Sequence, residues 1–498
     1  MTRSDAPRSV PTADDPDPRR WRALSVTLVA GFMTLLDVSI VAVALPSMQR
    51  SLGADPATVQ WVVSGYALTF GLALVPAGRL GDALGRRRMF LGALTGFVLC
   101  SGLAGAASNV GLLVAARLAQ GLAAGSLAPQ NSGLIQQMFS GDERGRAFGL
   151  FGATVGVSTA IGPIVGGFIL ALADGPDGWR WIFYVNVPIG VVALVLAARL
   201  IPRTAPVGTG RIDVVGGLLL GGCVFAVLLP LAEADAGGLT RLWWLFVVAA
   251  VMAVLFVRWE RRVTRHRGAP LLDLRLLSRT RGYATGAALG TVYFLGFSGI
   301  WIVFALFLQS GVGYTPLQSG LSVTAFAIGS AVSAAVGGRF VERFGRRLTV
   351  IGLTGVLSGL GATIGVVLLA PPAALTGALA APLLVAGLGG GLVISPNITL
   401  SLREVPVRMA GSAGGALQTG QRVGAAIGTA ALPGAYYLVL GADGENQQVA
   451  AAVALSGAVL SVSAALGIAV RDLRNERRAR RRRCSEEETH SFDHPARI

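Results

Sequence analysis

The sequence predicts an all-α integral membrane protein, and three observations lead to that fold class. Apolar residues make up 53% of the chain and charged residues only 14%, whereas an ordinary soluble protein carries about a quarter charged residues. The mean hydropathy is +0.63. The apolar residues also gather in continuous runs of about 20, the length that an α-helix needs to cross a bilayer, without the alternation of a barrel strand.

Fourteen such runs follow one another, and each predicts one transmembrane helix. The first 22 residues are polar and hold no apolar core, so we expect no cleaved signal peptide. The predicted loops are no longer than roughly 25 residues, which leaves no room for a soluble catalytic domain. The predicted helices lie at 24–46, 58–78, 89–107, 110–133, 146–171, 181–201, 214–232, 242–257, 283–310, 315–337, 349–369, 374–400, 409–435 and 448–470.

The net charge of +16 is a topology signal and does not indicate a nucleic-acid partner. All 42 basic residues are arginines. Of these, 37 fall in the N-terminus, alternate loops and the C-terminal tail, and only Arg50, Arg180 and Arg241 fall in the other loops. Because positive charge stays on the cytoplasmic side, both termini are expected in the cytoplasm, as an even number of spans requires. The sequence therefore predicts a multi-pass membrane protein surrounded by lipids. The use of arginine for every basic residue is typical of a GC-rich bacterial genome, so we expect the bacterial inner membrane.

The residue types exclude several activities. The chain has no lysine, so it lacks the phosphate-binding lysine of a P-loop ATPase. Neither a metal site nor a disulfide framework is expected, because the histidines are predicted to be cytoplasmic and the cysteines have no metal-ligand spacing. Without a cofactor, energy is expected to come from an ion gradient, and a membrane enzyme has weak support. The residues concerned are His266, His490, His494, Cys100, Cys223 and Cys484.

An internal repeat predicts the architecture. Residues 78–88 and 338–347 match at an offset of 260, with glycines, one carboxylate and arginines in register. Six spans of about 30 residues account for only about 180 of that offset, so the excess indicates a two-helix insert between two parallel six-helix repeats. The expected parts are a cytoplasmic N-terminus at 1–23, a six-helix bundle at 24–201, an inserted pair at 212–258, a second six-helix bundle at 282–470 and a basic cytoplasmic tail at 471–498.

Several segments resemble one transporter family. Residues 78–88 resemble the loop 2–3 signature of the major facilitator superfamily. Residues 36–46 are similar to the span-1 motif of its fourteen-span drug:proton antiporters, although that family usually has Thr and Asn where this chain has Ser39 and Ala42. Further similarities occur at 117–121 in span 4, at 162–167 in span 5, at 179–188 and around Arg422 in span 13.

The resemblance covers nearly the whole chain, and it implies a function. It implies two six-helix bundles plus two inserted helices, which export amphipathic drugs or antibiotics in exchange for protons by alternating access. Small amphipathic substrates and protons are the expected partners, and a monomer is the expected functional unit. A proton-coupled uptake symporter and a membrane sensor without turnover remain alternatives.

Asp37 and Arg117 form the candidate proton-coupling site. Asp37 is the one carboxylate deep inside a predicted span, and an ionised carboxylate there costs several kcal/mol unless it is paired. Counting 1.5 Å per residue from the span ends places both charges at a similar depth, about 12–13 Å from the outer surface. A guanidinium nearby favours the ionised carboxylate, and its removal favours proton binding. The alternative is a permanent structural ion pair.

Two further groups are expected to move or seal the transporter. The family resemblance assigns a cytoplasmic gate to the repeated turns, where a simple turn is the alternative. The span-5 motif is associated with antiporters, and its glycines are also explained by close helix packing. The gate residues are Gly78, Asp82, Gly85, Arg86 and Glu342, and the antiporter motif comprises Gly162, Pro163, Gly166 and Gly167.

Polar and aromatic residues inside the spans are candidates for a substrate cavity. Tyr66, Gln120, Gln130 and Asn131 are uncharged, and interhelical hydrogen bonding is their alternative role. Arg422 lies about mid-depth in span 13 without an acidic neighbour in its own helix. It is expected either to contact substrate or to fix helix packing, since a buried arginine must find acceptors.

Overall fold

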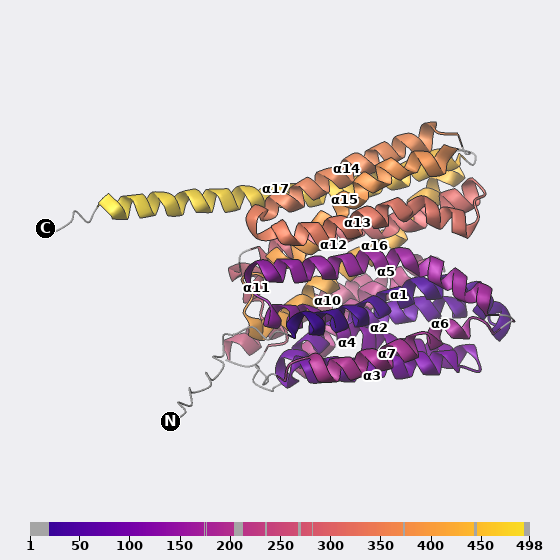
Figure 1. The fold of residues 1–498 in the computed structure, drawn as a ribbon, viewed down its shortest axis with the longest axis horizontal. Coiled ribbons are helices and arrows are strands. Elements are labelled where there is room, and N and C mark those ends of the chain that lie inside the picture. The colour runs from indigo at the N-terminus through magenta and orange to yellow at the C-terminus, as the bar shows by residue number, and fades with distance from the viewer. Residues whose placement is uncertain are drawn as a thin grey trace, which may run out of the picture.

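The computed structural model is almost entirely helical (Figure 1). It describes residues 19–492 apart from 174, 176, 204–212, 235–236, 267–269, 281, 372–373 and 443–445, and this described part contains no β-strand. The helices are α1 (Arg20–Leu52), α2 (Pro56–Leu84), α3 (Arg86–Gly105), α4 (Val110–Met138), α5 (Gly141–Leu172), α6 (Arg180–Tyr184), α7 (Asn186–Leu200), α8 (Val214–Ala232), α9 (Gly238–Arg241), α10 (Trp244–Arg265), α11 (Arg275–Arg279), α12 (Tyr283–Ala305), η2 (Leu306–Gly311), α13 (Pro316–Phe344), α14 (Arg346–Leu369), α15 (Leu375–Leu402), η4 (Val407–Met409), α16 (Ala410–Ala442) and α17 (Gln447–Phe492).

Polar side chains fix where several of these helices begin. Asp55 and Asn109 precede α2 and α4, and each side chain accepts the backbone N–H of the residue three positions on. Thr315 and Gln318 form a reciprocal capping box at the start of α13. Each contact satisfies an N–H that has no partner inside the helix, and so favours a helix start at that point.

The sequence repeat is reproduced at the level of helices. α2 and α13 contain 29 residues each and begin at residues 56 and 316, the same offset of 260. Gly85 ends α2 with φ at 100°, and Gly345 ends α13 with φ at 53°. Residues other than glycine rarely adopt such backbone angles, so the glycines allow a sharp turn into α3 and α14.

Two bundles follow from how the helices pack. In the N-terminal bundle, α2 and α3 pack on α4, and α1 packs on α5. In the C-terminal bundle, the corresponding helices α13 and α14 pack on α15, and α12 packs on α16. The bundles meet where α5 crosses α13 and where α2 crosses α16. Figure 1 shows them side by side, with the indigo-to-magenta N-terminal helices along one side and the orange C-terminal helices along the other.

α8 and α10 form a pair that packs against both bundles. α8 contacts α10, α2 and α16. Leu68 of α2 packs with Val224 and Leu228 of α8, and Val423 and Ala426 of α16 join the same cluster. The inserted pair therefore covers one of the two lines along which the bundles meet.

The outer surface of the molecule is apolar along the helices. Leu218, Leu438 and Leu460 are 70%, 77% and 73% exposed, which suits a surface that faces lipid. Among the described residues, twelve helices are long and apolar enough to cross a membrane. The predicted all-α, multi-pass membrane fold is confirmed. α5 and α10 lie at predicted spans 5 and 8 and are not among these twelve, so fourteen crossings stay a prediction.

The last helix includes both the predicted span 14 and most of the predicted tail. We expected the span to end near residue 470 and a basic cytoplasmic tail to follow, and α17 continues through that tail to Phe492, so the end of the span stays a prediction. Figure 1 shows its yellow end running past the bundles. Residues 471–492 are rich in arginine and glutamate, which are strong helix formers, so the sequence contains no helix stop at the membrane surface. The predicted N-terminus mostly precedes the described residues.

Candidate functional site

Asp37 lies in the middle of α1 and is only 1% exposed. Its Oδ2 accepts a hydrogen bond from Nη1 of Arg117 within an ion pair. Its Oδ1 accepts hydrogen bonds from Nε2 of Gln120 at 3.2 Å and from Nδ2 of Asn186 at 3.0 Å. Since a buried carboxylate needs donors to offset its lost hydration, these three side chains provide the hydrogen bonds that Asp37 requires inside the bundle.

Arg117 is fully buried on α4 and makes contacts beyond the carboxylate. Its Nε donates to the carbonyl of Val62 at 2.9 Å, and Nη1 also donates to Oε1 of Gln120 at 2.7 Å. Its guanidinium lies 4.2 Å from the centroid of the Tyr66 ring and 5.6 Å from that of Phe183. Nη2 has no hydrogen-bond partner in the described part of the chain. The Arg117 side chain is therefore held firmly, but the two N–H groups of Nη2 have no acceptor among the described residues.

A proton bound to Asp37 would disturb the contacts of this cluster. A proton on Oδ2 would remove the charge that holds Arg117, and a proton on Oδ1 would oppose the N–H groups of Gln120 and Asn186. Either proton leaves at least one donor without its acceptor, which costs about 1–3 kcal/mol for a buried group. Proton exchange at Asp37, which stays a prediction, would therefore require its neighbours to move.

Asn186 is a site residue that sequence reasoning missed. It is the first residue of α7, is 3% exposed, and its Nδ2 also contacts Oγ of Ser101 at 3.2 Å. It lies within the segment 179–188 that resembles the family, where no residue was assigned a role from the sequence. A single amide inside the predicted sixth span was the available signal.

Asp82 connects the two bundles at the end of the molecule that carries the arginine-rich loops, here called the arginine-rich end. It is 3% exposed at the end of α2. Its two oxygens accept the backbone N–H groups of Gly411 at 3.1 Å and Ser412 at 2.9 Å, at the start of α16. Arg86 donates to Asp82 at 2.9 Å and to the carbonyl of Val407. A carboxylate at a helix N-terminus is favoured by the exposed N–H groups and the helix dipole.

Gly78 allows α2 and α16 to touch beside that contact. A Cβ atom on Gly78 would lie 2.3 Å from the carbonyl oxygen of Gly411. On the other side of the molecule, a Cβ on Gly145 of α5 would lie 2.5 Å from the carbonyl oxygen of Gly338 in α13. Both crossings are therefore backbone-to-backbone contacts, and they close the arginine-rich end between the bundles.

The second repeated turn makes different contacts. Arg346 corresponds to Arg86, but it donates to Asp472 at 2.8 Å and to Asn397 at 2.7 Å inside its own bundle. Glu342 faces Arg144 of the other bundle. Burial lowers the pKa of Arg144, and the negative charge of Glu342 opposes that shift. The two turns share a sequence pattern and position but not their ion pairs.

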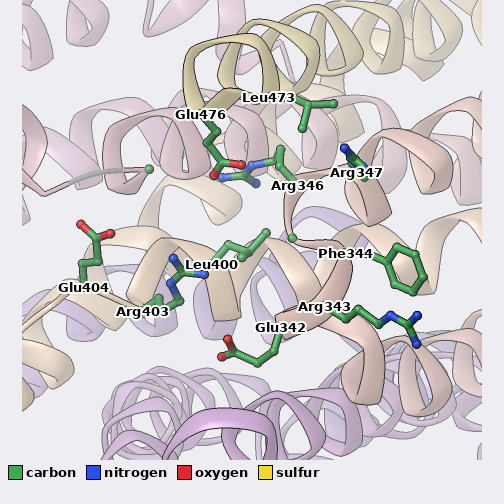
Figure 2. A pocket seen from close by; sticks show the side chains of 12 residues that line it. Glu342, Arg343, Phe344, Arg346, Arg347, Leu400, Arg403, Glu404, Leu473 and Glu476 are labelled. Carbon is green, nitrogen blue, oxygen red and sulfur yellow. The ribbon is translucent and has the colours of Figure 1, made fainter. Parts of the chain in front are cut away.

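A pocket of about 210 Å³ opens beside this second turn. Figure 2 shows Glu342 and Arg403 on one side of it and Arg346 and Glu476 on the other. Arginine and glutamate side chains alternate around it, so it presents neither a strongly positive nor a strongly negative surface.

The span-5 glycines seat α5 on α1. A Cβ on Gly162 would lie 2.1 Å from the side chain of Ser39, and one on Gly166 would lie 3.3 Å from the carbonyl oxygen of Ile40. Gly167 has nothing within 4 Å, so close packing does not require it. The side chain of Pro163 lies outside the described residues. The sealing role of this motif stays a prediction.

The uncharged cavity candidates lie between packed helices in this conformation. The hydroxyl of Tyr66 donates to the carbonyl of Thr34 at 3.0 Å, and Nε2 of Gln130 donates to the carbonyl of Ala77 at 2.8 Å. Gln120 belongs to the Asp37 cluster. These side chains and Asn131 are at most 1% exposed. Their contact with a substrate stays a prediction.

Arg422 differs from those residues because its side chain is only half-buried. Its guanidinium lies 4.3 Å from the centroid of the Phe70 ring. In the described part of the chain it forms no ion pair.

Within the same part, no group of three or more histidine, cysteine, aspartate or glutamate side chains could hold a metal ion.

The chain is similar in sequence to known transporters. The family description Major Facilitator Superfamily matches residues 27–429 and, in a second match, 286–492. A probable actinorhodin transporter of Streptomyces coelicolor is 37% identical over 447 residues, covering 88% of this chain and 76% of that protein. Puromycin resistance protein pur8 of Streptomyces alboniger is 37% identical, covering 84% and 82%. The tetracenomycin C resistance and export protein of Streptomyces glaucescens is 32% identical, covering 83% and 75%.

Solved structures of low sequence identity share the fold. The human organic anion transporter MFSD10 (TETRAN) superposes with a TM-score of 0.67 at 15% identity, covering 91% of this chain and all of that chain. The proton:xylose symporter XylE superposes with a TM-score of 0.64 at 14% identity, covering 90% and 95%. At these identities the likeness concerns the arrangement of helices alone.

Proposed function

The chain belongs to the major facilitator superfamily, and on that premise we propose that it is a proton-coupled antiporter that exports amphipathic drugs or antibiotics. Export is favoured over uptake because the relatives described above are named as resistance or export proteins. Proteins of this family are transporters, so we assign no enzymatic reaction. The proposed location is the bacterial cytoplasmic membrane, with both termini in the cytoplasm, in agreement with the distribution of arginines.

The observation that carries the proton-coupling part of the proposal is the buried cluster of Asp37, Arg117, Gln120 and Asn186. It supplies one ionisable group at membrane depth, with donors that must rearrange when a proton binds. Intramembrane carboxylates of this kind mark proton pathways in transporters. The cluster lies entirely inside the N-terminal bundle, so its rearrangement can change how that bundle packs.

The closed arginine-rich end suggests which state the structure represents. Under the proposed orientation, the contacts of Asp82 with α16 and the glycine crossings close the cytoplasmic side. The inter-bundle hydrogen bonds that we find among the described residues lie on the cytoplasmic side of Arg422. Proton arrival from outside and substrate release to the outside both belong to this state. The transporter then needs to break the Asp82 contacts to open inward.

The proposed cycle connects these two sites. A proton that enters from outside neutralises Asp37, and Arg117 loses its counter-charge. The bundles then rearrange, the Asp82 contacts separate, and the proton leaves to the cytoplasm as substrate enters. Each bundle rocks as a largely rigid unit around the central site, as alternating access requires. One acid at membrane depth suits one proton per cycle, and the chain is proposed to work as a monomer.

Proteoliposome transport tests the proposed function. Full-length protein would be reconstituted, and uphill movement of a lipophilic dye would be followed with an imposed pH gradient, without one, and after an uncoupler. We expect concentration of the dye on the acidic side, where protons enter, and loss of that gradient with the uncoupler. Dye accumulation on the opposite side would indicate symport. The absence of any gradient-driven movement would contradict transport and favour a sensor.

A further inference from the structure

We infer that Arg422, together with the ring of Phe70, forms a subsite that binds an anionic group of an aromatic substrate, such as a carboxylate or a phenolate. The inference rests on the proposed function, because it names a substrate class for that export site. It concerns the C-terminal bundle, whereas the proton site lies in the N-terminal one. The distances, burial and charges around Arg422 support it in four steps.

The first step is charge balance. Asp37 and Arg117 neutralise each other in a fully buried ion pair. Arg422 lies in the middle of α16, and within the described residues no ion pair includes it. A guanidinium that is partly removed from water without a counter-ion is costly. A ligand that brings a negative charge would supply the missing partner.

The second step is the position of Arg422 along α16. The backbone N–H of Ser412 donates to Asp82 at the cytoplasmic end, and Gln418 donates to the carbonyl of Ala128 in α4 at 3.3 Å. Arg422 comes one helical turn after Gln418, on the same face of the helix, and about 15 Å above Ser412. It is therefore the first charged side chain of α16 above the hydrogen bonds between the bundles, and it contacts Phe70 of the opposite bundle.

The third step is the geometry of the guanidinium. Phe70 covers one face of it, with the ring centroid 4.3 Å from Cζ. The side chain is half-buried, which leaves part of it accessible to a ligand. A guanidinium donates a planar fork of N–H groups that matches a carboxylate, and its open face stacks on aromatic rings. An aromatic acid or phenol satisfies both features at once.

The fourth step is a connection to the proton site. Two aromatic rings lie between the two arginines. Arg117 lies 4.2 Å from the centroid of the Tyr66 ring, and the Tyr66 and Phe70 ring centroids are 6.2 Å apart. Arg422 lies against the Phe70 ring. Tyr66 and Phe70 belong to α2 of the N-terminal bundle, whereas Arg422 belongs to the C-terminal bundle. Movement between the bundles would therefore change how Arg422 is covered, and with it the affinity for an anion.

Two xanthene dyes of opposite charge test the subsite. Fluorescein carries a carboxylate and a phenolate, and rhodamine 6G is an esterified cation on the same ring system. Binding to purified full-length protein would be measured by fluorescence anisotropy for wild type, Arg422→Gln, Arg422→Lys and the control Arg50→Gln, which removes an exposed arginine at the outer end of α1.

We expect Arg422→Gln to weaken fluorescein binding about tenfold or more and to leave rhodamine 6G binding within about twofold. Arg422→Lys should restore part of the fluorescein affinity, and Arg50→Gln should match wild type for both dyes. Equal weakening for the two dyes, or no change, would overturn the inference.

Dye efflux from proteoliposomes separates the two proposals. Arg422-dependent binding without gradient-driven efflux contradicts only the proposed function, and efflux of fluorescein that is independent of Arg422 contradicts only the subsite.

Discussion

Asp37 is stable in the middle of an apolar helix only because donors from two other helices reach it. Arg117 and Gln120 come from α4, and Asn186 comes from α7. The substitution Asp37→Asn removes the charge but keeps the size and shape of the side chain, so it tests proton binding without a large change in packing. An asparagine at position 37 still accepts a hydrogen bond, but it cannot exchange a proton at physiological pH.

We therefore expect Asp37→Asn to insert and fold but to lose gradient-driven export. With one pH unit across the membrane, wild type should build a dye gradient of up to about tenfold, and the variant should build none. Dye binding and downhill exchange should remain measurable. Asp142→Asn, an exposed carboxylate at the start of α5, serves as the control. Full uphill transport by Asp37→Asn would exclude Asp37 as the proton site.

The buried carboxyl of Glu260, outside the predicted spans, predicts how the stability of the protein depends on pH. It lies beyond the predicted eighth span and is not exposed. Its Oε1 accepts the backbone N–H groups of Leu271 at 3.1 Å and Leu272 at 3.4 Å, and its Oε2 has no partner within the described residues. Burial raises the pKa of Glu260 from 4.5 to about 7. Between these two values the folded protein binds more protons than the unfolded chain, so stability falls as pH rises.

The stability of the variant Glu260→Gln should not fall as pH rises through this range. We expect its apparent melting temperature to exceed that of wild type by about 2 °C at pH 8 and the difference to vanish near pH 4.5. Melting of the purified protein would be followed by intrinsic fluorescence at several pH values. Glu404→Gln, an exposed carboxylate at the same end, should change little. Parallel pH curves for wild type and Glu260→Gln would show that the buried carboxyl does not titrate in this range.

The residue scale also shows what a sequence can and cannot predict about the site. Counting along spans 1 and 4 placed Asp37 and Arg117 at the same depth, because a helix advances by a fixed rise per residue. The structure brings the two into contact. Asn186 was missed because its partner lies 149 positions away, and no local pattern encodes which faces of two helices meet. The same reason hid the contact between Arg422 and Phe70.

At the scale of helices, the crossing of α2 and α16 depends on glycine at position 78. A methyl group there would lie 2.3 Å from a backbone carbonyl oxygen of the opposite helix. Backbone cannot move aside without separating the helices. We expect Gly78→Ala to shift the population of conformers away from closure at the arginine-rich end.

Cysteine accessibility measures that shift. In a background without native cysteines, a cysteine placed at Ser412 should react several-fold faster with a water-soluble maleimide when Gly78→Ala is present. Gly92→Ala on α3 is a matched control, since nothing lies within 4 Å of a Cβ added there. Unchanged labelling in Gly78→Ala would contradict the assignment of this crossing to the gate.

Helix ends could be predicted to different degrees, for physical reasons. The glycine turns at 85 and 345 were recognisable because glycine is the residue that tolerates a positive φ. The end of α17 was not, because arginine and glutamate favour both a solvated surface and a continued helix. The predicted sixth span is divided into α6 and α7 at Val185, and nothing in its apolar pattern indicated that break.

At the scale of the whole molecule, the charges at membrane depth limit the substrate. Asp37, Arg117 and Arg422 together carry a net positive charge when Asp37 is ionised. Glu233, an acid near the outer end of α8, is paired with Arg241. A dicationic substrate would need a second buried acid, because each unpaired buried charge costs several kcal/mol. We expect monovalent or neutral amphipaths to be exported and bis-cationic biocides to be poor substrates, as measured by efflux of matched mono- and dicationic dyes.

The same charges predict how export depends on the membrane potential. If one proton enters for each substrate that leaves, export of an anion, a neutral compound or a monocation moves two, one or no net positive charges inward. Each charge is driven by about 2.3 kcal/mol per 100 mV, whereas the pH gradient adds about 1.4 kcal/mol per unit in every case. At 100 mV, the attainable gradient should therefore rise about 50-fold from a monocation to a neutral dye, and about 50-fold again to an anion. Potassium diffusion potentials in proteoliposomes, set at a fixed pH difference, measure this order directly. Equal voltage dependence for the three dyes would refute one-for-one exchange, and voltage-driven export of a dication would require a second acid that moves with the proton.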